Sequence, residues 1–183
     1  FSRLPHYLAR FISLTGATLD SADVLFAGLA EHGIAHPEKQ AVITALETAQ
    51  DWDQPHRTVA RVLAAAEQRH PGADTADSRL MAAAPTIREA ARGGDLADIV
   101  AGLTALTEAD DDWLAESAGN LAAGCPTTAH LIHDQLETGR YLSLAQAVQR
   151  ELAMALACCR HADFAEGVRA LLVDKDKTPA WRY

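Results

Sequence analysis

The sequence predicts an almost wholly α-helical chain, and three observations support that fold class. Apolar residues recur at the three- and four-residue spacing of a helix face over most of the 183 residues. Asp, Ser and Pro stand at the places where helices start, and Gly stands at several places where they end. No stretch gives a convincing strand, with alternating apolar and polar residues between turn residues. We therefore expect an all-α chain.

Helices are expected throughout the first part of the chain. The first runs from Pro5 to Leu14, and a short second helix is capped by Asp20. The short helix carries Val24, Leu25 and Leu29, with Gly28 inside it. Two further helices begin at Pro37 and Pro55. Proline at a first helical position costs nothing, because the N–H group that it lacks would have no helical partner there. The loop from His70 to Asp77, with its Pro, Gly, Asp and Thr, is the best candidate for an internal boundary.

Further helices, several of them shorter, are expected in the second part. They are Ser78 to Arg92 with or without a break at Pro85, Asp95 to Leu106, Asp110 to Ala123, Pro126 to Thr138, a helix after Ser143 and a helix after Asp163. The last two have the clearest start signals, because Ser143 with Gln146 fits a capping box and Asp163 with Glu166 is a looser version of it. In the helix after Ser143, apolar residues recur at every fourth position: Leu144, Val148, Leu152 and Leu156.

Composition and charge argue against several classes of function. The formal net charge of −9 disfavours binding to nucleic acid or to an anionic membrane surface, because both attract basic protein faces. No apolar run approaches the roughly 18 residues that a membrane span needs, and no signal peptide opens the sequence. The three cysteines, two of them adjacent at Cys158 and Cys159, form no disulfide framework, which fits a reducing compartment. We therefore expect a soluble, cytoplasmic protein.

The stretch from Asp163 to Trp181 reads Asp-Phe-Ala-Glu-Gly-Val-Arg-Ala-Leu-Leu-Val-Asp-Lys-Asp-Lys-Thr-Pro-Ala-Trp. It resembles the C-terminal signature of the 3-hydroxyisobutyryl-CoA hydrolases, a branch of the crotonase (enoyl-CoA hydratase/isomerase) superfamily. Near the start, Ser2-Arg-Leu-Pro, Phe11-Ile-Ser-Leu-Thr-Gly and Ala22-Asp-Val-Leu-Phe-Ala-Gly-Leu-Ala are similar to the helix pair after that family's catalytic loop. Gly124-Cys-Pro-Thr-Thr is a counterpart of the family's Ser-Pro-Thr segment, with Cys in place of Ser.

The resemblance implies a fold and a place for the catalytic residues outside this chain. The family fold is a spiral of ββα turns followed by helices that cover the active site, so the chain resembles the helical C-terminal portion of a crotonase-like fold. Residues 1–34 would be the end of the spiral core, residues 35–123 a helical family-specific region, and residues 124–183 a C-terminal lid and association segment. The family's working Glu and Asp lie shortly before the segment that matches Ser2-Arg-Leu-Pro, which places them upstream of Phe1. No catalytic residue is therefore expected here, and the N-terminal half of the same protein, which carries those carboxylates, is the expected partner.

Lys175 and Lys177 are the candidate binding residues. In crotonases the corresponding helix end lies near the nucleotide part of CoA, so lysines there, with Arg182 close by, would suit its phosphates. The alternative is a solvated tail whose lysines complement the helix dipole, because Asp174 and Asp176 beside them weaken any field that attracts phosphate.

Other titratable clusters have simpler structural explanations. Asp163, Glu166 and Arg169 could form an acid–base site, but helix capping and an i,i+3 ion pair explain all three. No metal site is expected, because His130 and His133 could share a helix face but the sequence fixes no third ligand for them.

Structural roles are expected for the cysteines and for two of the tryptophans. Cys125 precedes a helix start, where a thiolate is favoured, but no base is assigned to it. Cys158 and Cys159 are expected to be small core residues. Trp113 and Trp181 are expected to be anchors against a partner surface.

The resemblance also implies an activity for the complete protein. That activity is hydrolysis of the thioester of 3-hydroxyisobutyryl-CoA, or of a similar short 3-hydroxyacyl-CoA, as a step of valine breakdown. CoA enters as part of the acyl-CoA substrate, so no cofactor is expected, and this chain alone is expected to be inactive. Enoyl-CoA hydratase or isomerase chemistry on the same scaffold is the nearest alternative, and a non-catalytic helical interaction module is the alternative from another class. A homo-oligomer is a further option, because these helices often mediate oligomers in the family.

Overall fold

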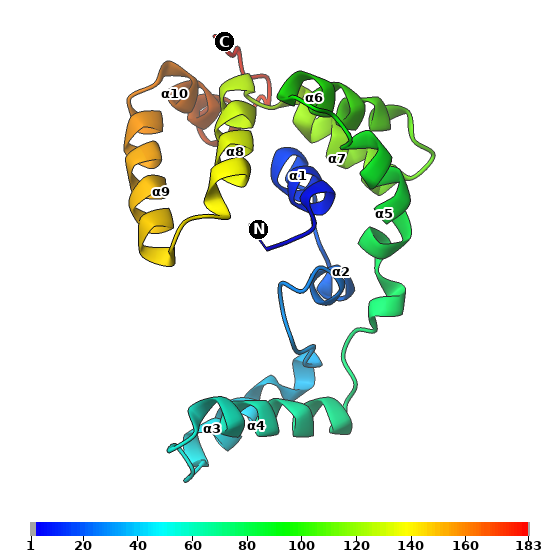
Figure 1. The fold of residues 1–183 in the computed structure, drawn as a ribbon, viewed down its shortest axis with the longest axis vertical. Coiled ribbons are helices and arrows are strands. Elements are labelled where there is room, and N and C mark those ends of the chain that lie inside the picture. Colours follow the sequence, from blue (N-terminus) through cyan, green and yellow to red (C-terminus); the bar gives the residue numbers. More distant parts are fainter. Residues whose placement is uncertain (1–2, 183) are drawn as a thin grey trace. The chain divides into compact units, whose positions relative to one another are not determined.

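A computed structural model describes residues 3–182 and confirms the all-α prediction. Within this range the chain forms ten α-helices: α1 (His6–Thr15), α2 (Ser21–Phe26), α3 (Lys39–Thr48), α4 (Pro55–Arg69), α5 (Arg79–Ala90), α6 (Leu96–Thr104), α7 (Asp112–Ala123), α8 (Pro126–Gly139), α9 (Leu144–Cys159) and α10 (Ala162–Val168) (Figure 1). Short 3-10 turns cover His36–Glu38, Thr75–Asp77 and Ala105–Glu108, and one π-helical turn covers Arg169–Val173. Residues 3–182 contain no strand beyond an isolated antiparallel bridge between Ile34 and Pro71.

The chain divides into two compact units. Unit 1 comprises residues 1–17 and 87–183, and unit 2 comprises residues 18–86, so the second division falls inside α5. The loop from His70 to Asp77, the expected internal boundary, instead lies within unit 2. The family resemblance implies a different division, into residues 1–34, 35–123 and 124–183. The compact units do not test that division, so it stays a prediction.

Helix α1 supplies the centre of unit 1. Its Leu8, Phe11 and Ile12 are buried, and the Phe11 ring meets the Trp113 ring of α7 edge-on, with centroids 5.5 Å apart. Arg10 Nη1 donates a hydrogen bond to the Ala91 carbonyl over 3.0 Å, which links α1 to the residue that follows α5. The other buried apolar residues of unit 1 between residues 87 and 121 lie in α5 to α7 and in the segments that connect them: Ile87, Ala91, Ile99, Leu103, Leu106, Leu114, Ala118 and Leu121.

The end of α1 follows the expected stop signal. Gly16 adopts a left-handed conformation (φ 61°), and its N–H group donates to the Ile12 carbonyl. Glycine takes this conformation without the steric cost that other residues meet, so the Thr15-Gly16 pair ends the helix.

Asp23 joins two elements of unit 2. It forms a capping box with Asp20 at the start of α2, and its Oδ1 also accepts hydrogen bonds from the Ser78 hydroxyl and the Leu80 N–H group, each over 2.8 Å. Burial alone would raise the pKa of this fully buried carboxyl, but the hydrogen bonds from Leu80 and Ser78 outweigh it and lower the pKa. The buried charge is thereby satisfied, and the start of α5 is fixed to α2.

The hairpin of α3 and α4 has a small apolar core. Val42, Val62 and Ala66 are buried between the two helices, and Ile34, Ala45, Leu46 and Leu63 pack around them. Arg69 of α4 donates two hydrogen bonds to Glu38 Oε2, over 3.0 and 2.7 Å. A core this small buries little apolar area, so the polar contacts at its rim matter for holding the hairpin together.

The structure corrects or settles three details of the expected elements. Helix α2 ends at Phe26, and Gly28 lies beyond it with φ 68°, so Leu29 is not on the helix. Pro37 lies in the 3-10 turn before α3 rather than at the start of that helix, whereas Pro55 does begin α4. Helix α5 continues through Pro85, although a proline in a helix interior removes one backbone hydrogen bond and typically costs about 3 kcal/mol.

Candidate functional site

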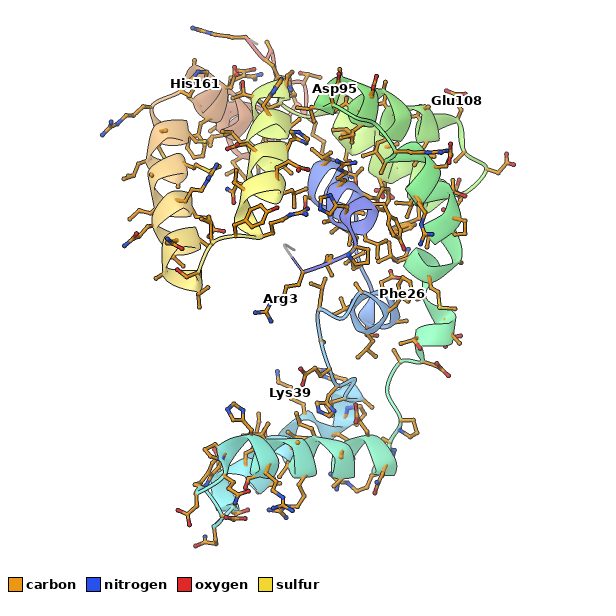
Figure 2. All side chains as sticks on the ribbon, viewed as in Figure 1. Arg3, Phe26, Lys39, Asp95, Glu108 and His161 are labelled. Carbon is orange, nitrogen blue, oxygen red and sulfur yellow. The ribbon has the colours of Figure 1, made fainter. Side chains whose placement is uncertain are left out.

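The stretch that carried the family resemblance folds back on itself at the end of unit 1. It begins with α10, passes through the π-helical turn Arg169–Val173 and returns along α10 as an irregular tail over residues 174–182. Figure 2 shows His161 at the connection between α9 and α10, where this region starts.

Arg169 is the centre of the fold-back. Its Nε and Nη2 donate to the two carboxylate oxygens of Glu166, over 2.9 and 2.7 Å. Its Nη1 donates to Asp174 and Asp176, over 2.6 and 2.7 Å, and Nη2 reaches the Thr178 carbonyl over 3.2 Å. The planar guanidinium with its five donors suits this arrangement, because it can serve several acceptors in fixed directions. The expected i,i+3 pair with Glu166 is confirmed, while the contacts with the tail were missed.

Arg169 favours the ionised forms of Glu166 and Asp176. The hydrogen bonds from Arg169, followed by the one from the Ala180 N–H group, lower the pKa of Glu166 to about 2. The hydrogen bond from Arg169 also lowers the pKa of Asp176, and the carboxylates together raise the pKa of Arg169. Because all these groups stay charged at neutral pH, they form a permanent structural tie and not a proton-transfer site.

Three further contacts fasten the end of the tail. The Ala180 N–H group donates to Glu166 Oε1 over 2.8 Å, the Arg182 N–H group donates to Asp163 Oδ1 over 2.9 Å, and Trp181 Nε1 donates to the Ala123 carbonyl over 3.0 Å. A Cβ atom at Gly167 would lie 3.3 Å from the Trp181 ring, so glycine there allows the indole to approach the helix closely.

The predicted role of Asp163 as the helix cap was wrong. The residue at the cap position is His161, and Asp163 lies in the first turn of α10, where it is 4% exposed. Its carboxylate holds the returning tail through Arg182 instead of closing a capping box with Glu166. The partner lies 19 residues further along the chain, so local spacing could not reveal it.

Lys175 and Lys177, the predicted CoA-phosphate residues, lie on this tail and are exposed. Both adopt the left-handed backbone conformation, with φ 57° at each position. The neighbouring Asp174 and Asp176 bind Arg169, and no ion pair of either lysine is found within residues 3–182. Their role toward the CoA phosphates stays a prediction.

An apolar groove of about 550 Å³ lies beside the tail, between α8, α9 and α10. Its apolar walls include Leu131, Phe164, Val168, Leu171, Leu172 and the Trp181 ring. Its polar groups converge on Asp163 Oδ2, which accepts from the Cys125 thiol over 3.7 Å and lies 3.9 Å from His161 Nδ1.

The polar corner of the groove connects two helices. The Cys125 thiol, at the start of α8, donates to one oxygen of the Asp163 carboxylate on α10. The other oxygen of that carboxylate holds the backbone of Arg182. The arrangement links α8 to α10, and the expectation that Cys125 is not a nucleophile stays a prediction.

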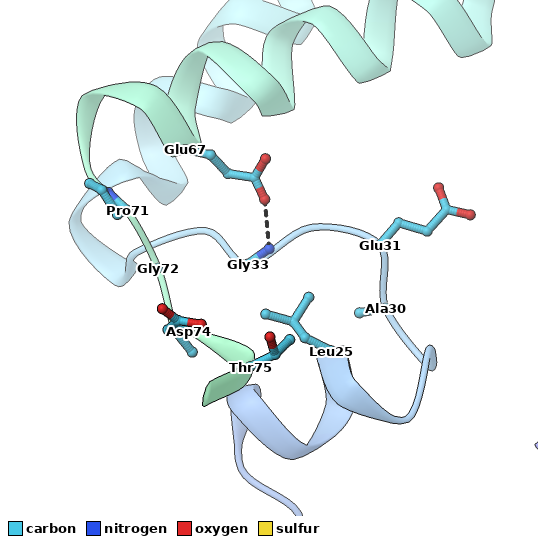
Figure 3. A pocket seen from close by; sticks show the side chains of 10 residues that line it. Leu25, Ala30, Glu31, Gly33, Glu67, Pro71, Gly72, Asp74 and Thr75 are labelled. Carbon is cyan, nitrogen blue, oxygen red and sulfur yellow. Dashed lines mark hydrogen bonds between the residues drawn. The ribbon is translucent and has the colours of Figure 1, made fainter. Parts of the chain in front are cut away.

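A second hollow, of about 480 Å³, lies in unit 2 (Figure 3). Glu67 on α4 accepts from the Gly33 N–H group over 2.9 Å and contacts His32 Nδ1 over 3.0 Å. The hydrogen bond with His32 lowers the pKa of the Glu67 carboxyl, as does the one from Gly33. These contacts tie α4 to the loop after α2, which accounts for Glu67 structurally.

Comparison with known proteins identifies the family. The family model described as enoyl-CoA hydratase/isomerase matches residues 1–183. The chain belongs to this family. The resemblance seen in the sequence is thereby confirmed, and the all-α fold corresponds to the C-terminal half of a crotonase-family protein.

Several relatives of the family are 3-hydroxyisobutyryl-CoA hydrolases. The chain is 30% identical to 3-hydroxyisobutyryl-CoA hydrolase 1 of Arabidopsis thaliana, over 98% of the chain and 47% of that protein. It is 31% identical to the mitochondrial 3-hydroxyisobutyryl-CoA hydrolase of Danio rerio, over 98% of the chain and 46% of that protein. The mitochondrial hydrolase of Dictyostelium discoideum is 27% identical over 98% of the chain and 45% of its own length. The chain therefore spans about half the length of these crotonase-family relatives.

One expectation about side-chain environments was wrong. Cys159 is exposed and Cys158 is only partly buried, so they are not both small core residues. Within this chain Trp113 contacts Phe11, and Trp181 contacts Ala123 and Gly167. Their expected role as anchors against a partner surface stays a prediction.

The part of the chain that the structure describes has neither a metal-binding group of side chains nor a helix that could cross a membrane. Between residues 3 and 182, no three His, Cys, Asp or Glu side chains are grouped so that they could hold a metal ion. None of the described helices has the length and apolar character to cross a membrane.

Proposed function

We propose that this chain is the C-terminal part of an enzyme that hydrolyses 3-hydroxyisobutyryl-CoA, or a similar short 3-hydroxyacyl-CoA, to the free acid and CoA in valine catabolism. The observation that carries the proposal is the match of 98% of the chain to 3-hydroxyisobutyryl-CoA hydrolases at 30–31% identity. The folded tail from Asp163 to Trp181, the stretch that most resembles the hydrolases, adds support because its residues form one connected cluster.

The proposal divides the work between two halves. Hydrolysis breaks the bond between the acyl carbon and sulfur, adds the elements of water, and leaves a carboxylic acid and a thiol. The carboxylates that move the protons or attack the acyl carbon, and the backbone N–H groups that stabilise the oxyanion, belong to the N-terminal half in this proposal. That half is accordingly the first partner of the chain.

For the chain itself we assign a role in enclosing the acyl-CoA. Lys175 and Lys177 are its proposed contacts with the CoA phosphates. Arg169 binds the neighbouring Asp174 and Asp176, which reduces the acidic field that would otherwise oppose phosphate. Lysine acts here as a point charge that attracts a phosphate without fixing its orientation.

The test is an assay of the complete protein with two substrates. With a 3-hydroxyacyl-CoA we expect release of free thiol, and with a 2-enoyl-CoA we expect no loss of enoyl absorbance. Loss of enoyl absorbance without thiol release would favour hydratase or isomerase chemistry, which the description of the family model as enoyl-CoA hydratase/isomerase supports. Residues 1–183 alone should show no thioesterase turnover, and measurable turnover would overturn the division into halves.

A non-catalytic helical interaction module is the remaining candidate, and it makes a different prediction. The isolated chain would then be well folded and monodisperse and would have no affinity for an N-terminal half. The apolar side chains exposed along α9 count against it, because a free-standing module would be expected to cover them. A cytoplasmic location remains part of the proposal, and fractionation of cells tests it.

A further inference from the structure

One ring nitrogen of His6 lies between two residues at the C-terminal end of α8. In unit 1, α1 packs against α8 (Figure 1). His6 is the first residue of α1, and its Nδ1 lies 3.3 Å from Arg140 Nη2 and 4.0 Å from Glu137 Oε1. Glu137 lies in the last turn of α8, and Arg140 directly follows that helix. The same nitrogen therefore faces a hydrogen-bond donor and a hydrogen-bond acceptor.

The contact with Arg140 requires the uncharged form of His6. A guanidinium group donates hydrogen bonds and cannot accept one. His6 Nδ1 must therefore be the acceptor, which places the proton of the neutral ring on Nε2. A proton on Nδ1 would occupy the lone pair that receives the Arg140 hydrogen bond, and it would set two positive charges against each other. The observed arrangement is thus the one that suits the neutral ring.

Glu137 lacks the hydrogen-bond donor that a protonated His6 would supply. Its Oε1 is buried and accepts no hydrogen bond from the residues that the structure describes. Arg10 Nη2 lies 3.5 Å from this oxygen, but the Nη1 atom of the same guanidinium donates to the Ala91 and Gly93 carbonyls and holds the group there. A buried acceptor without a partner destabilises the fold, so the approach of a donor is favourable. Protonated His6 Nδ1 is such a donor, and it lies 4.0 Å away.

The charges around His6 favour an exchange of partners over a simple loss of contact. Arg10 on α1 and Arg140 after α8 are positive, and Glu137 supplies the negative charge between them. When His6 gains a proton, the ring repels Arg140 and is attracted to the Glu137 carboxylate. The protonated ring then takes the place that Arg140 leaves beside α8.

The other helices that touch α1 hold its neighbouring residues in place. Arg88 of α5 lies over the Tyr7 ring, 4.7 Å from its centroid, and its Nη2 donates to the Tyr7 hydroxyl over 3.4 Å. The Trp113 ring of α7 meets Phe11. These contacts fix α1, so a change at His6 is expressed at the end of α8.

We propose that His6 is a proton-dependent link between α1 and the end of α8. Neutral His6 accepts from Arg140, and protonated His6 releases Arg140 and donates to Glu137. Because Arg140 lies in the connection between α8 and α9, the exchange alters the position of that connection. The inference concerns unit 1 alone and does not rest on the proposed function.

The experiment records NMR spectra of the complete protein at two pH values, with isotope labels on histidine, arginine and glutamate. Histidine is the side chain that changes its charge between about pH 5 and 8, so these two values are compared. Nuclear Overhauser effects report which side chain lies next to the His6 ring, whose signals are assigned by their loss in His6→Gln. We expect effects from Arg140 at pH 8 and from Glu137 at pH 5. The ratio of the two intensities should change by at least about fivefold.

Two variants show whether the proton on His6 causes the exchange. In His6→Gln, the amide oxygen can accept from Arg140 at either pH, so the Nε–H signal of Arg140 should shift between pH 5 and pH 8 by less than about a fifth of its shift in the unmodified protein. His130→Gln, at an exposed position on α8, is the matched control and should leave that shift unchanged. An Arg140 signal that moves as far in His6→Gln as in the control would overturn the proposal, as would a His6 ring with the same neighbour at both pH values.

A third variant tests the role of Glu137. Glu137→Gln removes the negative charge that attracts the protonated ring, so the contact between His6 and Arg140 should persist to a lower pH than in the unmodified protein. The intensity of the Arg140 effect is followed in steps from pH 8 downward, which keeps the comparison within the range where both proteins are folded. The same pH dependence in the two proteins would show that Glu137 is not the second partner, and the proposal would be wrong.

Discussion

At the scale of single residues, the guanidinium of Arg169 binds three carboxylates and one carbonyl that lie on both sides of it in the sequence. Lys175 and Lys177 adopt left-handed backbone conformations between those acceptors, at a cost of roughly 1 kcal/mol or more for each residue. Such conformations persist only where the surroundings fix them. The Arg169 contacts with Asp174 and Asp176 provide that constraint, so one side chain determines the path of the tail.

Replacing Arg169 with Lys should release the tail. An ammonium group keeps the charge but cannot serve Glu166, Asp174 and Asp176 in fixed directions, so trypsin should cleave after Lys175 and Lys177 about tenfold faster. The substitution preserves the number of tryptic sites. Arg160→Lys, at an exposed position, is the matched control, and equal cleavage rates in both variants would contradict this account.

Acid should also release the tail. The pKa of Glu166 falls from its ordinary value of 4.5 to about 2 in the folded chain, so the ionised carboxylate stabilises the folded tail above pH 4.5. That contribution is lost progressively as the pH falls from 4.5 toward 2. The indole N–H signal of Trp181, assigned by its loss in Trp181→Phe, should shift over this interval in an NMR titration. A signal that stays constant down to pH 2 would argue against the Glu166 tie.

At the scale of elements, sequence reasoning succeeded where the signal is local. The capping box of Ser143 and Gln146 and the glycine stop at Gly16 act within a few residues, and both formed as predicted. It failed where a distant neighbour decides the outcome, as for Asp163, whose carboxylate holds the backbone of Arg182. Helix α5 continues through Pro85 because the local cost of the proline does not prevent the helix from forming when its two ends are packed.

The link between α2 and α5 can be tested at Asp23. Replacing it with Ala would leave the Ser78 hydroxyl and the Leu80 N–H group without their acceptor and remove the acceptor of the Asp20 N–H group in the capping box of α2, which should cost about 3 kcal/mol of unfolding free energy. Urea denaturation of the complete protein measures the loss. Asp77→Ala, at an exposed position in the same unit, should change the stability by less than about 1 kcal/mol. Similar losses in the two variants would show that Asp23 has no special linking role.

At the scale of the whole molecule, the ends of the sequence were enough to predict the family, because the tail motif is long and specific. The candidate site was harder to predict. Lys175 and Lys177 could be named from the resemblance. The roles of Asp174 and Asp176 depend on their contacts with Arg169. Sequence spacing does not predict such contacts, because the tail has no regular secondary structure. The catalytic groups belong, in the proposed function, to the half of the protein that lies outside this chain.

Removing the positive charge of the two lysines should weaken binding of the acyl-CoA without slowing the chemistry. For Lys175→Gln with Lys177→Gln in the complete protein, we expect KM to rise about tenfold while kcat stays within about twofold, because the phosphates lie far from the thioester. Rising salt should reduce the difference from the unmodified protein. Lys39→Gln, at an exposed position on α3, is the matched control. An unchanged KM would remove the lysines from the binding site.

The exposed apolar side chains of α9 have a practical consequence for handling this polypeptide. Leu144, Val148, Leu152 and Leu156 face water on one helix and favour association of molecules at the concentrations reached during purification. Aggregation would then reflect this surface and not a defective fold. Purification at low protein concentration is the remedy that follows.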